Sequence, residues 1–219
     1  LNDWDESVRL GKKYDVPVYA SLDEARMKDV QGAADRNSLD GYRGRASVAL
    51  EADVDGVLLF NYFDPKSPLW NQLDSREKLR GLPKKYFGSI RGLTRANGGN
   101  LSYDKYLTVE TLTPDTPRPL LAGKENVAKI SLGALNTERF RYTLGLRFAG
   151  KDVRDATLMQ FSVKLNGTPV SLIQIDNNWC NYAVDPSSIH PGSNQVTVAI
   201  SKDNPKALNW LDVRIEESE

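Results

Sequence analysis

The hydrophobic and polar positions of residues 39–65 predict a helix that leads into a buried strand. The apolar residues of its first half recur every three or four positions and are Tyr42, Ala46, Ala49 and Leu50. This spacing is typical of an amphipathic helix, which we expect to end at Asp55-Gly56. Residues 57–60 are continuously apolar, as in a parallel strand covered on both faces. Polar residues follow this strand directly, at the end where α/β folds place ligands and catalytic groups.

The pattern predicts a second short strand at residues 16–22, which ends in Asp23 and Glu24. A polar helix precedes it, and a further helix is predicted at residues 75–86, interrupted at residues 81–83. The resulting order of α, β, α, β, α is typical of a parallel sheet.

The pattern changes after a Gly/Asn-rich linker at residues 96–100. The predicted strands beyond it are residues 106–112, 127–132, 140–148, 159–165, 170–175, 181–184, 195–200 and 209–215. Short β-rich runs between turn residues are typical of an antiparallel sandwich. Asn166-Gly167 between two such runs is a strong signal for a hairpin turn.

Composition and charge exclude several classes of function. The chain has 29 basic and 29 acidic residues in 219, so bulk charge favours neither nucleic acid nor an anionic membrane as a partner. No apolar run is long enough to span a membrane. With a single cysteine (Cys180) and a single histidine (His190), we expect no disulfide and no metal site. No phosphate-binding motif is present, so we expect no nucleotide cofactor.

Three strings in the first half are RGRA at 43–46, ALEA at 49–52 and LFNYFDP at 59–65. Together they resemble the last helix and eighth strand of glycoside-hydrolase-like (β/α)8 barrels from bacteria. Residues 16–21 look like the seventh strand of such a barrel, and residues 79–87 look like its closing helix. The resemblance implies that six barrel strands are missing from this chain, which begins at Leu1 without a leader. Either the chain is a piece of a longer or processed protein, or its fold compensates for the missing strands in another way.

Two motifs in the second half are LNG at residues 165–167 and GSNQV at residues 192–196. They resemble the accessory β-sandwich modules of bacterial glycosidases, which are jelly rolls similar to galactose-binding-like domains. The predicted fold class is therefore α/β plus all-β, with a partial (β/α) barrel at residues 1–95 and an antiparallel β-sandwich at residues 101–219. The resemblance also implies a periplasmic or extracellular location.

Glycoside hydrolases use two carboxyl groups that flank the scissile bond. Glu24 is the best candidate and Asp23 the second, because both follow the first strand. The alternative is that these acids only begin a helix, where negative charge is favoured. A second carboxylate would come from a missing strand, so we expect this chain alone to lack a complete active site.

Further candidates could bind a sugar directly, through polar groups or through aromatic faces that pack on pyranose C–H groups. They are Asn61, Tyr62, Asp64, Tyr19, Trp70 and, in the sandwich, Trp179. The alternatives are a turn at Asp64-Pro65 and packing of the aromatic residues into the core. Arg43 and Arg45 are expected to be structural.

The sequence thus predicts the carboxyl-terminal portion of a glycoside hydrolase that acts on a carbohydrate. The alternative is a non-catalytic carbohydrate-binding or protein-interaction module. Two strands without neighbours would expose an apolar face, and such faces associate. We therefore also expect self-association or contact with the missing barrel segments.

Overall fold

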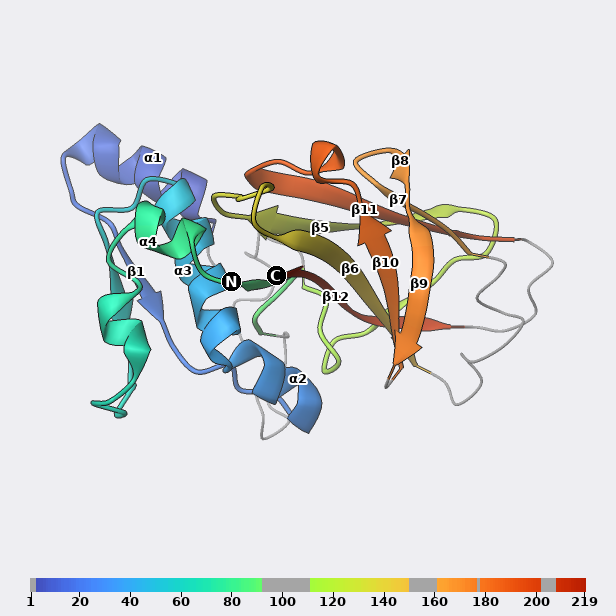
Figure 1. The fold of residues 1–219 in the computed structure, drawn as a ribbon, viewed down its shortest axis with the longest axis horizontal. Coiled ribbons are helices and arrows are strands. Elements are labelled where there is room, and N and C mark those ends of the chain that lie inside the picture. The colour runs from blue at the N-terminus through green and yellow to red at the C-terminus, as the bar shows by residue number, and fades with distance from the viewer. Residues whose placement is uncertain (1–2, 92–110, 150–160, 177, 202–207) are drawn as a thin grey trace.

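A computed structural model of the chain describes residues 3–91, 111–149, 161–176, 178–201 and 208–219. An α/β part lies at one end of the molecule and a β-sandwich at the other (Figure 1). The elements of the α/β part are α1 (Trp4–Tyr14), β1 (Tyr19–Leu22), α2 (Val30–Arg36), α3 (Leu39–Glu51), β2 (Gly56–Leu59), the 3₁₀ helix η1 (Pro68–Asn71) and α4 (Arg76–Arg80).

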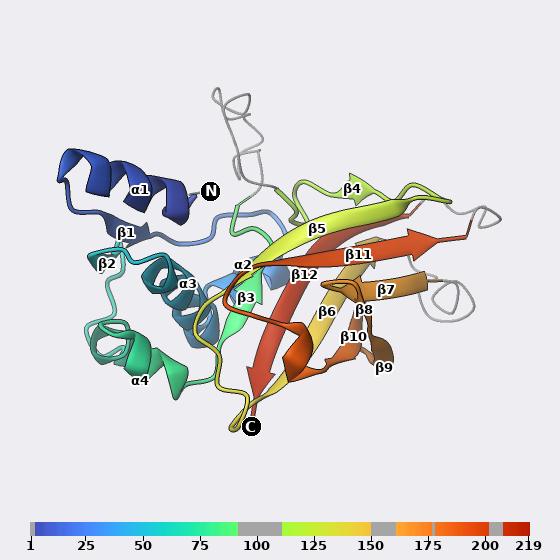
Figure 2. The same cartoon turned by 90° about the horizontal axis from the view of Figure 1, so that it is seen from above.

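The helix predicted within residues 39–65 is α3, and it lies between the two-stranded sheet and the sandwich (Figure 2). The Ser38 hydroxyl caps its first turn by accepting a hydrogen bond from the Gly41 N–H at 3.1 Å. Its small residues Ala46 and Ala49 are fully buried, and they belong to one apolar cluster with Ala20 and Leu22 of β1. One face of the sheet is therefore covered by α3.

Strands β1 and β2 are parallel neighbours, as predicted, in a register that pairs Tyr19 with Gly56 and Leu22 with Leu59. The prediction that the second strand is buried on both faces is wrong for the described part of the chain. Leu58 is 53% exposed and Tyr19 is 63% exposed. The described residues place no layer on the face of this sheet opposite α3. The sheet has two strands, whereas a closed (β/α)8 barrel has eight.

The helix predicted at residues 75–86 is also only partly present. Helix α4 ends at Arg80, and β3 (Lys85–Phe87) pairs with the last strand of the sandwich. The Gly-Leu-Pro sequence at residues 81–83 stops the helix, and pairing with a distant strand decides the conformation that follows. The chain thus enters the sandwich before the predicted linker. The linker itself and the predicted boundary between residues 95 and 101 lie outside the described residues.

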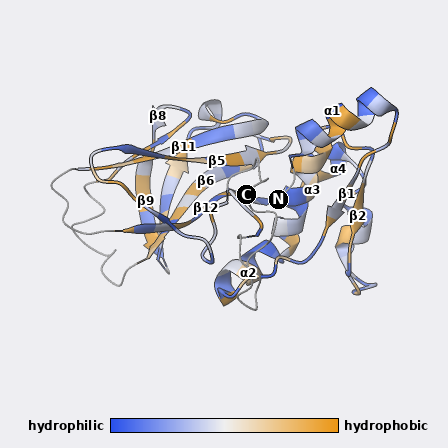
Figure 3. Ribbon diagram, turned by 180° about the vertical axis from the view of Figure 1, so that it is seen from behind, coloured by the Kyte–Doolittle hydropathy of each residue, from blue (hydrophilic) through white to orange (hydrophobic). Residues whose placement is uncertain are grey.

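The second half forms the predicted antiparallel β-sandwich. Its further elements are β4 (Arg118–Pro119), β5 (Glu125–Leu132), β6 (Arg141–Ala149), β7 (Phe161–Leu165), β8 (Thr168–Pro169), β9 (Ser171–Asp176), β10 (Trp179–Val184), the 3₁₀ helix η4 (Pro186–Ser188), β11 (Gly192–Ile200) and β12 (Asn209–Ser218). One sheet has the order β3-β12-β6-β10-β9 with β4 on β12, and the other has the order β5-β11-β7-β8. Hydrophobic and hydrophilic positions alternate along these strands (Figure 3), and the apolar side chains meet between the sheets.

The LNG and GSNQV motifs of the second half are hydrogen-bonded to each other. Asn166 and Gly167 form the predicted β7–β8 turn, with φ angles of 50° and 83°. The Asn166 amide donates to Asn194 Oδ1 at 2.7 Å and accepts from the Gln195 N–H at 2.8 Å. The LNG turn and the GSNQV strand are therefore bound to each other at one end of the sandwich.

Buried ion pairs join the α/β part to the sandwich. Arg36 of α2 pairs with Asp212 of β12, and the exposed fraction of both side chains is zero. Lys84 lies 2.7 Å from Glu217 of β12, and that pair is equally buried. The ion pairs connect α2 and the residue before β3 to β12, and β3 itself pairs with β12 through its backbone, so the two parts pack together around β12.

Glu217 makes the stability of this junction depend on pH. Burial, partly offset by Lys84, raises its pKa from 4.5 to about 7. Between these values the folded state binds a proton that the unfolded state has released, so the free energy of unfolding falls as the pH rises. We expect the free energy of unfolding of the wild type to fall relative to that of Glu217→Gln as the pH rises from 4.5 to 7.5 in urea titrations. If the free energies of unfolding of the two proteins changed in parallel over this pH range, the prediction would be contradicted.

Candidate functional site

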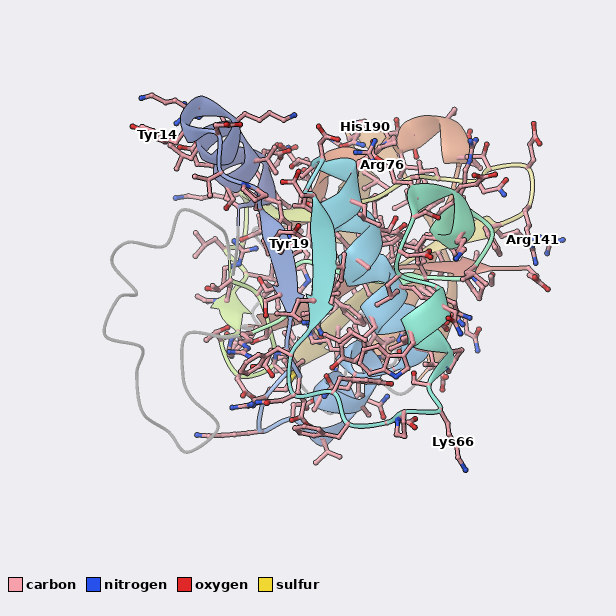
Figure 4. All side chains as sticks on the ribbon, turned by 90° about the vertical axis from the view of Figure 1, so that its left-hand side faces the viewer. Tyr14, Tyr19, Lys66, Arg76, Arg141 and His190 are labelled. Atoms are coloured by element: carbon pink, nitrogen blue, oxygen red, sulfur yellow. The ribbon has the colours of Figure 1, made fainter. Side chains whose placement is uncertain are left out.

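The loop after β2 carries four of the predicted binding residues, Asn61, Tyr62, Asp64 and Trp70. Asn61 adopts a left-handed conformation with φ 54°, which turns the chain away from the strand. Tyr62 Oη lies 2.8 Å from Ser67 Oγ, and Trp70 Nε1 donates to the Asp64 carbonyl oxygen at 2.7 Å. The predicted turn at Asp64-Pro65 is present, since an Asp64 carboxylate oxygen accepts the Lys66 N–H. This loop lies beyond the carboxyl ends of the strands, as the position of Lys66 in Figure 4 shows.

Three aromatic rings in contact with one another extend from α3 to the surface of this loop. Tyr42 of α3 meets Tyr62 edge-to-face with centroids 5.3 Å apart, and Tyr62 meets Trp70 in the same way at 5.8 Å. Tyr42 is buried, whereas Trp70 is 47% exposed. The ring of Trp70 is therefore held by a hydrogen bond and by an aromatic neighbour while part of it faces solvent.

Asp23 is engaged by cationic and backbone groups. Its carboxylate accepts hydrogen bonds from Arg91 and, at 2.8 Å, from the Glu24 N–H, and its carbonyl accepts from Arg45. A carboxylate with these partners stabilises the loop after β1. The Glu24 side chain is 63% exposed, and its carboxylate oxygen is 4.0 Å from Arg26 Nε. Of the two acids, Glu24 is the one that remains accessible.

Arg45, which the sequence suggests is structural, contributes to the same end of the sheet. Its guanidinium lies 4.8 Å from the centroid of the Tyr42 ring, and burial lowers its pKa. Arg91 also reaches this end and binds Asp23. The i, i+3 spacing of Tyr42 and Arg45 on one helix was the available signal for the first contact, whereas nothing local to residue 91 indicates the second.

Tyr19 and Trp179 lie away from this cluster. Tyr19 begins β1, so it is at the amino end of the sheet, where its ring lies across Gly56 (Figure 4). Trp179 belongs to β10 in the sandwich and is 3% exposed. Its ring packs beside Gly145 and 4.2 Å from the Arg214 guanidinium, which agrees with the packing alternative rather than with an accessible binding position.

The described residues contain no group of three or more His, Cys, Asp or Glu side chains arranged to hold a metal ion. None of the helices described is long and apolar enough to cross a bilayer. The described side chains at the carboxyl ends of β1 and β2 include aromatic rings, two arginines and carboxylates.

No family model matches the sequence, and no curated protein matches it. Among solved structures the chain is similar to BuGH86 in complex with neoagarooctaose, with 15% identity and a TM-score of 0.40, over 62% of this chain and 18% of that one. It is also similar to a β-porphyranase of glycoside hydrolase family 86 from the human gut bacterium Bacteroides plebeius, with 15% identity and a TM-score of 0.36, over 63% of this chain and 21% of that one. The chain thus spans about a fifth of the length of these proteins. Likeness at this level is too remote to assign an activity.

Proposed function

We propose that this chain is the carboxyl-terminal portion of a bacterial, exported glycoside-hydrolase-like protein, in which β1 and β2 are the last two strands of a (β/α)8 barrel. The jelly-roll-like sandwich then supports the barrel. The parallel register of β1 and β2 supports this assignment, as does the covering of one face by α3. The strings of residues 43–65 that resemble such barrels form α3, β2 and the loop after it.

We propose that a glycan binds at the carboxyl ends of β1 and β2, and the observation that carries this is the fixed, half-exposed ring of Trp70. A pyranose presents an apolar face of C–H groups that packs on an aromatic ring. A ring whose orientation is already set loses little entropy when the sugar binds. Asn61 and Glu24 each lie two residues beyond a strand end and are proposed to bind sugar hydroxyls.

The catalytic proposal concerns Glu24 alone. Asp23 is paired with Arg91 and is proposed to position the loop rather than to react. A glycosidase needs a second carboxyl group about 5–10 Å away, and under this proposal it comes from an earlier barrel strand. The alternative, a non-catalytic carbohydrate-binding module, shares the Trp70 site but requires no second carboxylate.

Calorimetric titration with a panel of neutral and acidic oligosaccharides, neoagarooctaose included, tests the binding site. We expect saturable binding to at least one glycan, weakened about tenfold by Trp70→Ala, which corresponds to about 1.4 kcal/mol. Tyr14→Ala is the matched control because Tyr14 is 65% exposed on α1, away from the site. Binding that Trp70→Ala leaves unchanged, or no binding across the panel, would rule the site out.

The same samples test whether the chain alone lacks a complete active site. Incubation of the bound glycan with the chain alone is expected to release no new reducing ends. Hydrolysis that disappears in Glu24→Gln would show that the chain already holds a complete catalytic pair, and the proposal of a carboxylate from an earlier strand would then be wrong.

A further inference from the structure

The face of the β1–β2 sheet opposite α3 is apolar and open. Tyr19 and Ser21 of β1 lie on this face, because Ala20 and Leu22 alternate with them and are buried on the other side. Ser21 is paired in register with Leu58, which is 53% exposed, and Phe60 follows at 47% exposed. Figure 4 shows this face toward the viewer, with α3 behind it.

Both outer edges of this sheet carry backbone groups that no described strand pairs with. The carbonyl oxygens of Val18 and Leu22 accept hydrogen bonds from the β2 side, namely from Asp55 and Phe60. Since backbone groups alternate between the two edges of a strand, Tyr19 and Ser21 present theirs at the outer edge of β1. Counted back from Phe60, whose N–H is donated to β1, the same alternation places the backbone groups of Val57 and Leu59 at the outer edge of β2.

Apart from their length of four residues each, neither strand carries the features that protect exposed edges in soluble proteins. The strand sequences are YASL for β1 and GVLL for β2, with no proline and no charged residue in either. Natural edge strands are usually guarded by lysine, proline, a bulge or a covering element. Parallel sheets are, in addition, almost always covered on both faces. An unguarded edge beside an open apolar face therefore indicates a surface that another part of the working molecule covers.

We propose that the open face and outer edges of β1 and β2 form an assembly surface for further parallel β-strands, supplied by βα segments of a longer polypeptide. This rests on the proposed barrel and assigns its contact surface. Added strands would pair with the backbone of Tyr19, Ser21, Val57 and Leu59. Their inward side chains would cover Tyr19, Leu58 and Phe60. Only a β-strand satisfies both needs at once, because a lipid or a face-packed second copy covers side chains but leaves edge amides unpaired.

Hydrogen–deuterium exchange of the 219-residue chain and of the natural polypeptide purified from its source tests this surface. In the natural polypeptide, amides in peptides covering residues 19–22 and 56–59 are expected to exchange at least about tenfold more slowly than in the isolated chain. The central strand β6, paired on both sides, is the internal control and should exchange equally in both. Equal exchange at β1 and β2 would overturn the proposal, as would a natural protein with an intact mass near 24.4 kDa.

Leu58→Lys distinguishes a covered face from an exposed one. We expect it to leave the melting temperature of the isolated chain nearly unchanged and to lower that of the natural polypeptide by about 5 °C or more, because the charge would be buried there. Leu121→Lys, at a site in the sandwich that is 52% exposed, should be neutral in both. A neutral Leu58→Lys in both would overturn the proposal. Neither readout involves glycan, so failure of the Trp70 titration leaves this test intact.

Discussion

Replacement of Asp212 by alanine is expected to lower the free energy of unfolding by about 3–5 kcal/mol. The Asp212 carboxylate accepts two hydrogen bonds from the Arg36 guanidinium, at 2.7 and 2.6 Å, and neither side chain is exposed. The guanidinium also lies 4.4 Å from the centroid of the Phe87 ring, which closes the site to water. Removal of the carboxylate would leave a buried cation without its counter-ion.

Urea denaturation measures this loss, with Glu219→Ala as the matched control. Glu219 forms an ion pair with Arg139 at the surface, where the two side chains are 69% and 50% exposed. We expect that control to cost less than about 1 kcal/mol. The double variant Arg36→Met with Asp212→Leu should recover most of the loss, because apolar residues fill the space without an unpaired charge. Equal costs for Asp212→Ala and Glu219→Ala would contradict the prediction.

The position of this pair bears on how the sandwich works. Arg36 ends α2 and Asp212 lies in β12, so the bond joins the first half of the chain to its last strand. A module that searched for glycans on a flexible tether would not need such a junction. The sandwich instead packs against the α/β part through β3 and two buried ion pairs, which favours a supporting role over independent binding.

The elements that sequence reasoning could predict are those specified by local patterns. The periodicity of α3, the apolar run of β2 and the Asn-Gly turn of β7–β8 each lie within a few residues, and each is present. Strand β3 was missed because it has only three residues and depends on pairing with β12 near the other end of the chain. No window around residue 86 contains that information.

In the candidate site, too, the contacts set by neighbouring residues could be predicted and those set by distant residues could not. The positions of Tyr62, Asp64 and Trp70 follow from a strand end, so the sequence could place them together. The partners of Asp23 could not be predicted, because Arg91 reaches it across 68 positions of the chain. An apolar run likewise indicates that a strand needs cover without saying where the cover comes from. That is why burial on both faces of β2 was expected and only one covered face is found.

Substitution of Gly44 by alanine is expected to destabilise the protein by about 2–3 kcal/mol, although alanine is the better helix former by about 1 kcal/mol. A Cβ atom at Gly44 would lie 2.1 Å from the carbonyl oxygen of Lys85 in β3. That oxygen belongs to the backbone of a paired strand, so it cannot move aside as a side chain would. The clash would push α3 away from the sandwich.

Gly81→Ala is the matched control, because a Cβ there would meet the Lys78 carbonyl oxygen at an ordinary 3.6 Å. Urea denaturation of both variants should give a loss for Gly44→Ala and little change for Gly81→Ala. A stabilised Gly44→Ala would mean that helix propensity outweighs the contact and that α3 is not held closely to β3. The consequence reaches the candidate site, since α3 also carries Tyr42 and Arg45. A helix displaced from β3 would shift Tyr42 relative to Tyr62 and disturb their edge-to-face contact, so glycan binding through Trp70 should weaken together with stability.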